Sequence, residues 1–320
     1  MLRIATRRSA LARAQAIQAG RLITARTGED FELVPMATTG DLYPDRPITA
    51  FETKGLFVDK IRQAVRSGDC DLVVHSYKDL PTDPCVGLVI GAVPPREDPR
   101  DALVTRGGYA LPAAATVGTS SQRRRLQLLF TRPSLQVLPL RGNLDTRLRK
   151  VAEGELDAVV VALAGLRRLY GAGPLELPVV VAPLDPDECL PSPGQGALAV
   201  ECRADDEAAL AVCGAIDDEA TRCTVQAERA YLERLGGGCL APVGALASVV
   251  SASELDLVGM LACPVTHKVL RRSLRGSMGD PQGLGAALAE DVRAAGGQPM
   301  LDLIEELRAR QAPQPAETEH

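Results

Sequence analysis

The sequence predicts an α/β protein with two similar α/β units and a smaller α+β unit at the C-terminus. Short apolar runs alternate with helical segments along the first 200 or so residues, and this alternation is typical of parallel sheets covered by helices. A length of 320 residues is enough for two or three domains that each bury a core. Aromatic residues make up 3% of the chain and Trp is absent, so we expect aliphatic cores.

The first unit is expected to begin with a strand and a helix that Ser9 caps. Gly68 is placed to end a second helix, and an uninterrupted apolar run then predicts a buried strand. A later strand is expected to return to this unit. The predicted strands cover residues 2–6, 71–75 and 197–201, and the predicted helices cover residues 9–18 and 56–67.

The second unit repeats the alternation, with strands over residues 103–104, 116–119, 136–140 and 158–162 and helices over residues 121–130 and 144–154. Proline-rich segments at residues 94–99 and 191–194 are typical of crossings between units. The third unit is expected to contain helices 224–235 and 284–294 and strands 243–250 and 255–261. We therefore expect domain 1 over residues 1–96 and 197–215, domain 2 over 97–196, domain 3 over 217–310 and a disordered tail over 311–320.

Composition excludes several classes of protein. Residues 1–12 lack the apolar core of a secretory signal, and no uncharged apolar run approaches a membrane span. Eight cysteines in such a chain indicate reduced thiols in the cytoplasm. They form no C-x-x-C pair, and three histidines are too few for a convincing metal cluster, so no metal site is expected. A net charge of −5 and few aromatics argue against nucleic acid.

A basic block interrupts this acidic chain. Residues 121–150 contain eight arginines and lysines and one acid, Asp145, which favours a pocket for a small anion. Within the block, Gly118 and three hydroxyl residues precede arginines in the first turn of a predicted helix. Arginines there oppose the helix dipole unless an anion binds at the same terminus. Arg141, Gly142 and Arg147 repeat the arrangement after the next strand. The run is not a P-loop, because G-x-x-x-x-G-K-[ST] is absent.

Polar residues also follow the predicted strands of the first unit. Arg7 and Ser9 could bind an anion at a helix N-terminus or simply cap the helix in solvent. Ser76, Lys78 and Asp79 lie at the carboxyl end of a buried strand, where ligands of α/β sheets bind. The pattern alone favours a surface ion pair for Lys78 and Asp79. The alternative is a carboxylate that acts as a general acid or stabilises a cation.

For two further residues, the pattern alone favours an interpretation without a functional role. Arg168 follows a predicted strand and is most simply a solvated arginine. Cys239 lies in a glycine-rich loop, where most cysteines are incidental, and no histidine nearby supports a Cys–His protease.

Taken together, nine runs resemble the porphobilinogen deaminase (hydroxymethylbilane synthase) family. They occur in the family's order between about residues 2 and 245, which makes coincidence implausible. The runs are LRIATRRS (2–9), KGLF (54–57), HSYKDLP (75–81), REDPRD (96–101), VGTSS (117–121), LRGN (140–143), PGQG (193–196), AERA (227–230) and GGC (237–239).

The resemblance implies a three-domain enzyme whose first two domains are similar to type-2 periplasmic binding proteins, with the active site between them. It implies a dipyrromethane cofactor, built from the enzyme's own substrate and joined to Cys239 through a thioether. Four porphobilinogen units are then added head to tail with loss of ammonia. Hydrolysis finally releases the linear tetrapyrrole hydroxymethylbilane. A tethered chain of six pyrroles would carry twelve carboxylates, which explains a need for many fixed cations.

The resemblance also implies roles for individual residues. Asp79 matches the catalytic acid, which assists loss of the amino group and stabilises positive charge on the pyrrole. Besides Cys239, the residues that match cofactor-binding positions are Ser76, Lys78, Thr119, Ser120, Ser121, Arg123, Arg124, Arg141, Gly142 and Arg147. Those that match substrate-binding or nearby loop positions are Arg7, Ser9, Lys54, Phe57, Arg168 and Gln195.

Several residues depart from the family's common pattern without removing a catalytic group. Gly236 stands where many members have Glu, and Tyr77 replaces a frequent Met.

The resemblance implies a cytoplasmic monomer that passes its product to uroporphyrinogen-III synthase. A non-catalytic binding protein for a small dicarboxylate is the alternative, but it leaves the loop around Cys239 and the third domain unexplained.

Overall fold

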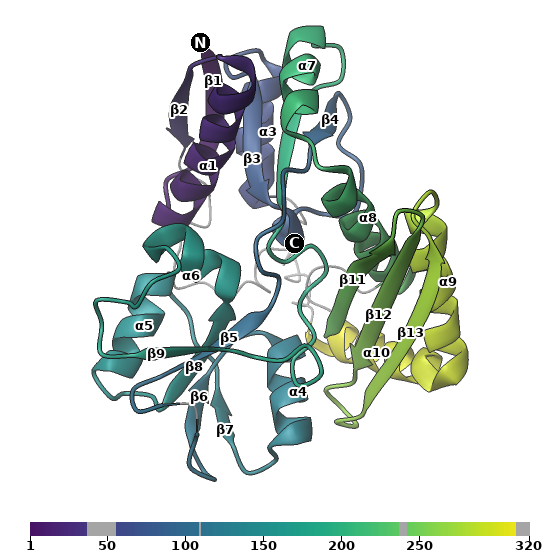
Figure 1. Cartoon of the computed structure of the whole chain (residues 1–320). Helices are drawn as coiled ribbons and strands as arrows, with labels where there is room; N and C mark the ends of the chain where they lie inside the picture. Colours follow the sequence, from purple (N-terminus) through teal and green to yellow (C-terminus); the bar gives the residue numbers. More distant parts are fainter. Residues whose placement is uncertain (37–55, 109, 237–241, 312–320) are drawn as a thin grey trace, which may run out of the picture.

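The computed structural model describes residues 1–36, 56–108, 110–236 and 242–311, and it contains three sheets (Figure 1). Two five-stranded sheets form the first two units, and a three-stranded sheet forms the third. The predicted combination of two α/β units and a smaller α+β unit is confirmed. Among the described helices, none combines the length and apolarity needed to cross a bilayer.

The first sheet has the strand order β2-β1-β3-β10-β4. Helix α1 packs on one face through Ile23 and Ala16 against Ile4, and helix α3 packs on the other through Ile61 against Ala5. Neighbouring residues of one strand thus face opposite layers, as strand geometry requires. The strands are β1 Leu2–Arg7, β2 Phe31–Met36, β3 Leu72–Ser76, β4 Leu88–Ala92 and β10 Leu198–Arg203, and the helices are α1 Ala10–Thr27, α3 Leu56–Arg66 and α7 Glu207–Ile216.

The second sheet has the order β7-β6-β8-β5-β9, with α5 and α6 on one face and α4 on the other. Val159 and Val161 face α5 and α6, whereas Ala158 and Val160 face α4. The strands are β5 Asp101–Thr105, β6 Thr116–Gly118, β7 Gln136–Leu138, β8 Ala158–Ala162 and β9 Val180–Pro183, and the helices are α4 Gln122–Thr131, α5 Leu144–Ala152 and α6 Leu163–Tyr170.

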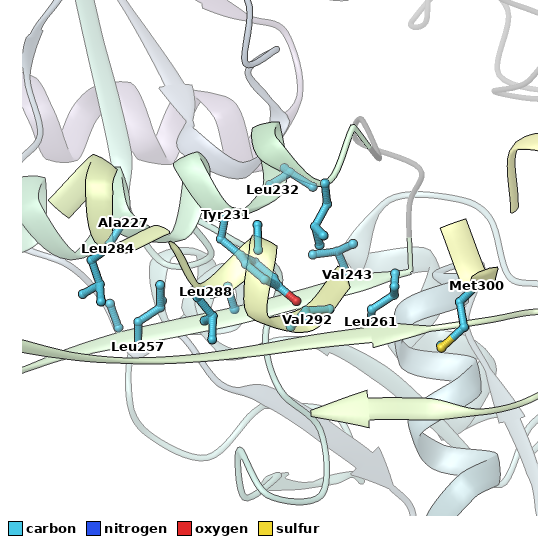
Figure 2. Close-up of a cluster of buried hydrophobic side chains, with 14 of the residues drawn as sticks. Ala227, Tyr231, Leu232, Val243, Leu257, Leu261, Leu284, Leu288, Val292 and Met300 are labelled. Carbon is cyan, nitrogen blue, oxygen red and sulfur yellow. The ribbon is translucent and has the colours of Figure 1, made fainter. Parts of the chain in front are cut away.

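The third unit packs helices against one antiparallel sheet of order β11-β12-β13. Figure 2 shows its core, where Tyr231 of α8 lies among Leu257 and Leu261 of the sheet and Leu288 and Val292 of α9. The elements are α8 Glu219–Arg234, β11 Val243–Ser251, β12 Glu254–Ala262, β13 Val269–Ser277, α9 Pro281–Val292, a π turn over Arg293–Gly297 and α10 Gln298–Gln311.

The expectation of parallel sheets was wrong for one strand at each crossing. Strand β10 runs antiparallel to β3 and β4, and β5 runs antiparallel to β8 and β9. Each of these strands enters its sheet directly from the other unit, without a crossover helix that would restore the parallel direction. An apolar run shows burial but carries no information about strand direction, so both sheets are mixed.

Sequence reasoning also missed several elements and ended α1 too early. Helix α1 continues to Thr27, where Gly28 adopts a φ of 77° and closes it. Strand β2 contains Pro35 and lies at a sheet edge, where a missing N–H is tolerated. The unpredicted elements are β2, β4, β9, α6, α7, β13 and α10.

A buried ion pair joins both crossings to the third unit. The guanidinium of Arg96 donates to the Glu228 carboxylate at 2.7 and 2.9 Å and to the carbonyl of Gln195 at 2.9 Å. The same carboxylate accepts the backbone N–H groups of Gly194 and Ala247 at 2.7 and 2.9 Å. Glu228 has no exposed surface, so its charge depends wholly on these donors.

We predict that Glu228→Gln destabilises the protein by about 3–5 kcal/mol, because it leaves the Arg96 charge buried without a carboxylate. Urea-induced unfolding followed by circular dichroism measures the loss. Glu290→Gln is the matched control, since its pair with Arg234 is exposed and should contribute less than about 1 kcal/mol. Equal losses in the two variants would contradict the structural role of the buried pair.

Candidate active site

A cavity of about 330 Å³ lies between the first two units. The carboxyl ends of β1 and β3 deliver residues to one side, and the starts of α5 and α6 form the other. The cavity thus lies at the carboxyl ends of strands, where ligands of open α/β sheets bind. Predicted site residues that line it are Arg7, Ser9, Ser76, Lys78, Asp79, Arg124, Gly142, Arg147 and Arg168.

Hydroxyl groups fix the strand ends on the first side. Ser9 caps α1 by accepting the N–H of Ala12 at 3.3 Å. Ser76, the last residue of β3, accepts a hydrogen bond from the Gln15 amide at 2.6 Å. Asp79 follows within the 3₁₀ turn Tyr77–Asp79 and is exposed at the cavity.

Lys78 points to a fixed acceptor. Its ammonium donates to Oε1 of Gln195 at 3.1 Å. The Gln195 amide nitrogen donates to Asp101 at 2.9 Å and to the carbonyl of Pro99 at 2.8 Å, which orients Oε1 toward Lys78. Burial lowers the pKa of Lys78 to about 8; the Asp79 carboxylate opposes this shift and the Arg124 charge adds to it. Burial therefore makes the Lys78 ammonium easier to deprotonate than that of an exposed lysine.

The anion at the N-terminus of α4 is a residue of the protein itself. Arg123 donates to the Asp101 carboxylate at 2.7 Å, and Arg124 donates to it at 2.7 and 3.0 Å. Burial alone would raise the pKa of Asp101, but the two arginines outweigh it and hold that pKa well below its usual range. Arg123 also donates to the carbonyl of Leu190 and lies outside the cavity lining, whereas Arg124 reaches the cavity.

The predicted hydroxyl residues 119–121 shape the turn before α4. Ser120 donates to the Leu140 carbonyl at 2.7 Å and accepts the Leu140 N–H at 3.0 Å. Thr119 accepts the N–H of Ser121, and Ser121 caps α4. Ser120 thus joins the turn before α4 to the segment that leads to Arg141. All three hydroxyl residues lie outside the residues that line the cavity.

Arginines of the second unit line the opposite side. Arg147 donates to the carbonyl of Gly142 at 2.9 Å, and burial, followed by the Arg124 charge, lowers its pKa. Arg168 donates to Gln18 at 2.8 Å and to the carbonyl of Gly196 at 2.7 Å, so it connects the two units. Burial lowers its pKa to about 10. Arg141 is exposed on the loop before α5.

Three predicted residues have no described side chain. Cys239 and Lys54 lie outside the described residues, and Phe57 is described only as part of helix α3. In the part of the chain that is described, no group of three or more His, Cys, Asp or Glu residues could hold a metal ion.

Sequence reasoning missed Asp101 and the glutamine Gln15, which hold site residues in place. Asp101 belongs to the REDPRD run, but nothing local marks it as buried. Its signal is an acid that begins a buried strand, where a charge requires partners.

The charges of the lining determine what the cavity can bind. Among the described lining residues, Arg7, Lys78, Arg124, Arg147 and Arg168 are cationic, and Asp79 and Asp145 are the acids. Burial disfavours the charged form of three of these cations, so negative charge in the cavity would stabilise them. The arrangement suits a ligand with several carboxylates, and Asp79 can meet positive charge that develops on it.

Comparisons with known proteins cover almost the whole chain. The family model of the porphobilinogen deaminase dipyromethane cofactor binding domain matches residues 2–211, and that of the family's C-terminal domain matches residues 222–294. The porphobilinogen deaminase of Roseiflexus sp. strain RS-1 is 46% identical over 303 residues, which cover 93% of this chain and 97% of that relative. That of Acidothermus cellulolyticus is 47% identical over 309 residues, with coverage of 94% and 91%.

Among solved structures, a periplasmic binding protein from Salmonella typhimurium matches 69% of this chain and 93% of its own, with a TM-score of 0.36 and 14% identity. The family models and the relatives extend over all three units. Members of this family are transferases of tetrapyrrole biosynthesis that use porphobilinogen and a dipyrromethane cofactor. This chain belongs to the porphobilinogen deaminase family.

Proposed function

We propose that this chain condenses four porphobilinogen units head to tail in the cavity between its first two units, with Asp79 as the catalytic acid. The product is the linear tetrapyrrole hydroxymethylbilane. The observation that carries the proposal is that Asp79 shares one cavity with Arg7, Lys78, Arg124, Arg147 and Arg168. The non-catalytic alternative, a binding protein for a small dicarboxylate, does not account for family membership along the third unit.

The cavity suits the dipyrromethane cofactor. A dipyrromethane made from two porphobilinogen units carries an acetate and a propionate on each ring. These carboxylates would stabilise the charged forms of the lining cations, which burial disfavours. Lys78, Arg124 and Arg147 would hold these carboxylates, because arginine matches them bidentately and lysine as a compact charge. When bound, the cofactor supplies the pyrrole carbon to which the first substrate unit is joined. We propose a thioether from Cys239 as its attachment.

Asp79 has two roles in this proposal. As a general acid it assists the loss of the substrate's amino group as ammonia. As a carboxylate it stabilises the positive charge that then develops on the pyrrole ring. Its exposed position at the cavity leaves it free to face a substrate. Arg7, Ser9 and Arg168 would hold the substrate's own carboxylates on either side of it.

The remaining predicted residues support the walls of the cavity. Gln195 orients Lys78, and residues 119–121 hold the turn before Arg124. Arg123 would act by fixing Asp101. Lys54, Phe57 and Arg141 are proposed as contacts from the adjoining loops.

We also propose that the protein is a cytoplasmic monomer that passes its product to uroporphyrinogen-III synthase. The described cysteines are free thiols, which suits a reducing compartment. We further propose domain boundaries at residues 1–96 with 197–215, 97–196 and 217–310. Most of the proposed tail, residues 312–320, lies outside the described residues.

Intact-protein mass spectrometry tests the attachment. We predict an added mass equal to two condensed pyrrole units on the purified protein, because the cofactor remains covalently bound. Cys239→Ser should remove this mass, whereas Cys223→Ser, at a partly buried thiol of α8, should keep it. A fully active protein without the added mass would refute the tethered cofactor.

For Asp79→Asn we predict a fall in kcat for ammonia release of about 10²–10⁴-fold, the usual contribution of general acid–base catalysis. Folding should be unchanged, because the Asp79 side chain is exposed. The comparison is Asp83→Asn, a nearby exposed acid outside the cavity lining, which should keep wild-type turnover. Wild-type turnover in Asp79→Asn itself would remove Asp79 from the reaction.

We predict that the rate at which the apoprotein acquires its cofactor falls as pH rises through about 8, because Lys78 then loses the proton with which it would bind a cofactor carboxylate. Lys78→Arg should abolish this fall, since a guanidinium stays protonated throughout the range. The measurement is a pH profile of the initial rate of cofactor acquisition for both apoproteins. An unchanged basic limb in Lys78→Arg would assign the titration to another group.

A further inference from the structure

The turn that carries Lys78 and Asp79 is held by a helix of the third unit. Arg229 of α8 donates to the carbonyls of Tyr77 at 3.3 Å, Leu80 at 3.0 Å and Pro81 at 2.5 Å. Its guanidinium carbon also lies 4.8 Å from the centroid of the Tyr77 ring, within the range of a cation–π contact. One side chain therefore contacts both ends of the 3₁₀ turn Tyr77–Asp79.

Helix α8 is a rigid base for this arginine. Ala227 and Tyr231, one turn apart, are fully buried in the core of the third unit (Figure 2). Val225 lies one turn before Arg229 and packs in a separate cluster with Tyr77 and Leu80. Since residues four apart share a helix face, α8 presents one face to its own core and another to the turn.

The neighbouring residue ties the same helix to the crossings. Glu228 binds Arg96 and the N–H of Gly194, and a Cβ on Gly194 would lie 3.3 Å from the backbone nitrogen of Lys78. The second crossing therefore packs directly against the turn. Helix α8 ends at Arg234, five residues before Cys239 in sequence. It thus links the crossings, the turn and the segment that precedes Cys239.

We propose that Arg229 is a positioning residue for the reaction: with the ring of Tyr77 it fixes the turn so that the Asp79 carboxylate stays directed into the cavity. This proposal rests on the role proposed for Asp79. The turn has one backbone hydrogen bond of its own, from the N–H of Leu80 to the carbonyl of Tyr77 at 3.2 Å. A charged donor that also binds this carbonyl and the two that follow the turn, those of Leu80 and Pro81, restricts the turn to one conformation. Without Arg229 the turn would remain, but its conformations would include ones with a misplaced carboxylate.

The test is steady-state kinetics of the Arg229→Ala holoenzyme. We expect kcat to fall about 100-fold, the cost of displacing a catalytic group by roughly 1 Å, while KM for porphobilinogen changes less than about twofold because Arg7 and Arg168, which would hold the substrate's carboxylates, lie outside the turn. Guanidinium chloride at low, non-denaturing concentration should restore part of kcat by occupying the vacated site. Unchanged kcat, or an equal loss in kcat and substrate affinity without rescue, would overturn the proposal.

Arg222→Ala is the matched control. Arg222 lies on the same helix and also donates to carbonyls of the first unit, but these belong to Ile90 and Gly91 of β4 and not to the turn. It should lower the thermal midpoint without lowering kcat. If both variants lose kcat alike, Arg229 acts through general stability and the proposal fails.

Two further variants keep the result decisive. Tyr77→Leu removes the ring but leaves the carbonyls in place, so it should lower kcat about two- to fivefold, the usual range for one cation–π contact; no loss would count against the proposal. In an Asp79→Asn background, Arg229→Ala should cause no further loss, because both act through one carboxylate. A full additional loss would refute the coupling. If Asp79→Asn alone keeps wild-type turnover, the proposed function fails instead, so the two failures are distinct.

Discussion

The rest of the cavity depends on the ion pairs and hydrogen bonds of the buried Asp101 carboxylate. A fully buried charge is costly unless donors surround it, and Asp101 is supplied by Arg123, Arg124 and Gln195. Each donor is thereby fixed for a second task. Arg124 is held at the cavity wall, and Gln195 directs its carbonyl oxygen at Lys78. A single acid at the start of β5 thus orients groups on both sides of the cavity.

The same geometry buries several cations of the cavity lining whose charged forms burial disfavours. Lys78 has a pKa of about 8 because of burial, below its ordinary 10.5, so its protonated form costs stability at neutral pH. That cost is relieved as pH rises from about 8 to 10.5, and it is also relieved when a carboxylate enters. Burial likewise lowers the pKa of Arg147 and of Arg168, which disfavours their charged forms. Ligand binding and folding stability are therefore linked in this cleft, and bound carboxylates should stabilise the protein by mass action.

Sequence reasoning captured the elements whose signal is local and missed those set by tertiary structure. The apolar runs of β3 and β8 and the cap at Ser9 were identifiable because burial and capping leave direct patterns. The arginines that open α4 led to the prediction of a bound ligand anion, but the anion that they contact in the structure is Asp101, 22 residues upstream of Arg123, and no pattern specifies such a pairing. The directions of β5 and β10 depend on how the chain crosses between units. The family motifs identified Asp79, but the contact of Arg229 with its turn joins residues 148 to 152 positions apart.

The two sides of the cavity, the turn with Lys78 and Asp79 and the facing arginines, are held in place by different parts of the chain. The turn with Lys78 and Asp79 is bound to α8 through Arg229, and α8 is embedded in the core of the third unit. The arginines opposite are carried by helices of the second sheet. Among the described residues, hydrogen bonds connect the two walls: Gln195 bonds to Lys78 and Asp101, and Arg168 bonds to Gln18. Because these ties are hydrogen bonds rather than a shared apolar core, the catalytic turn is anchored more firmly to the third unit than to the cationic wall it faces. The position of Asp79 is then set by the part of the chain that leads to Cys239, whereas carboxylate binding is set by another part.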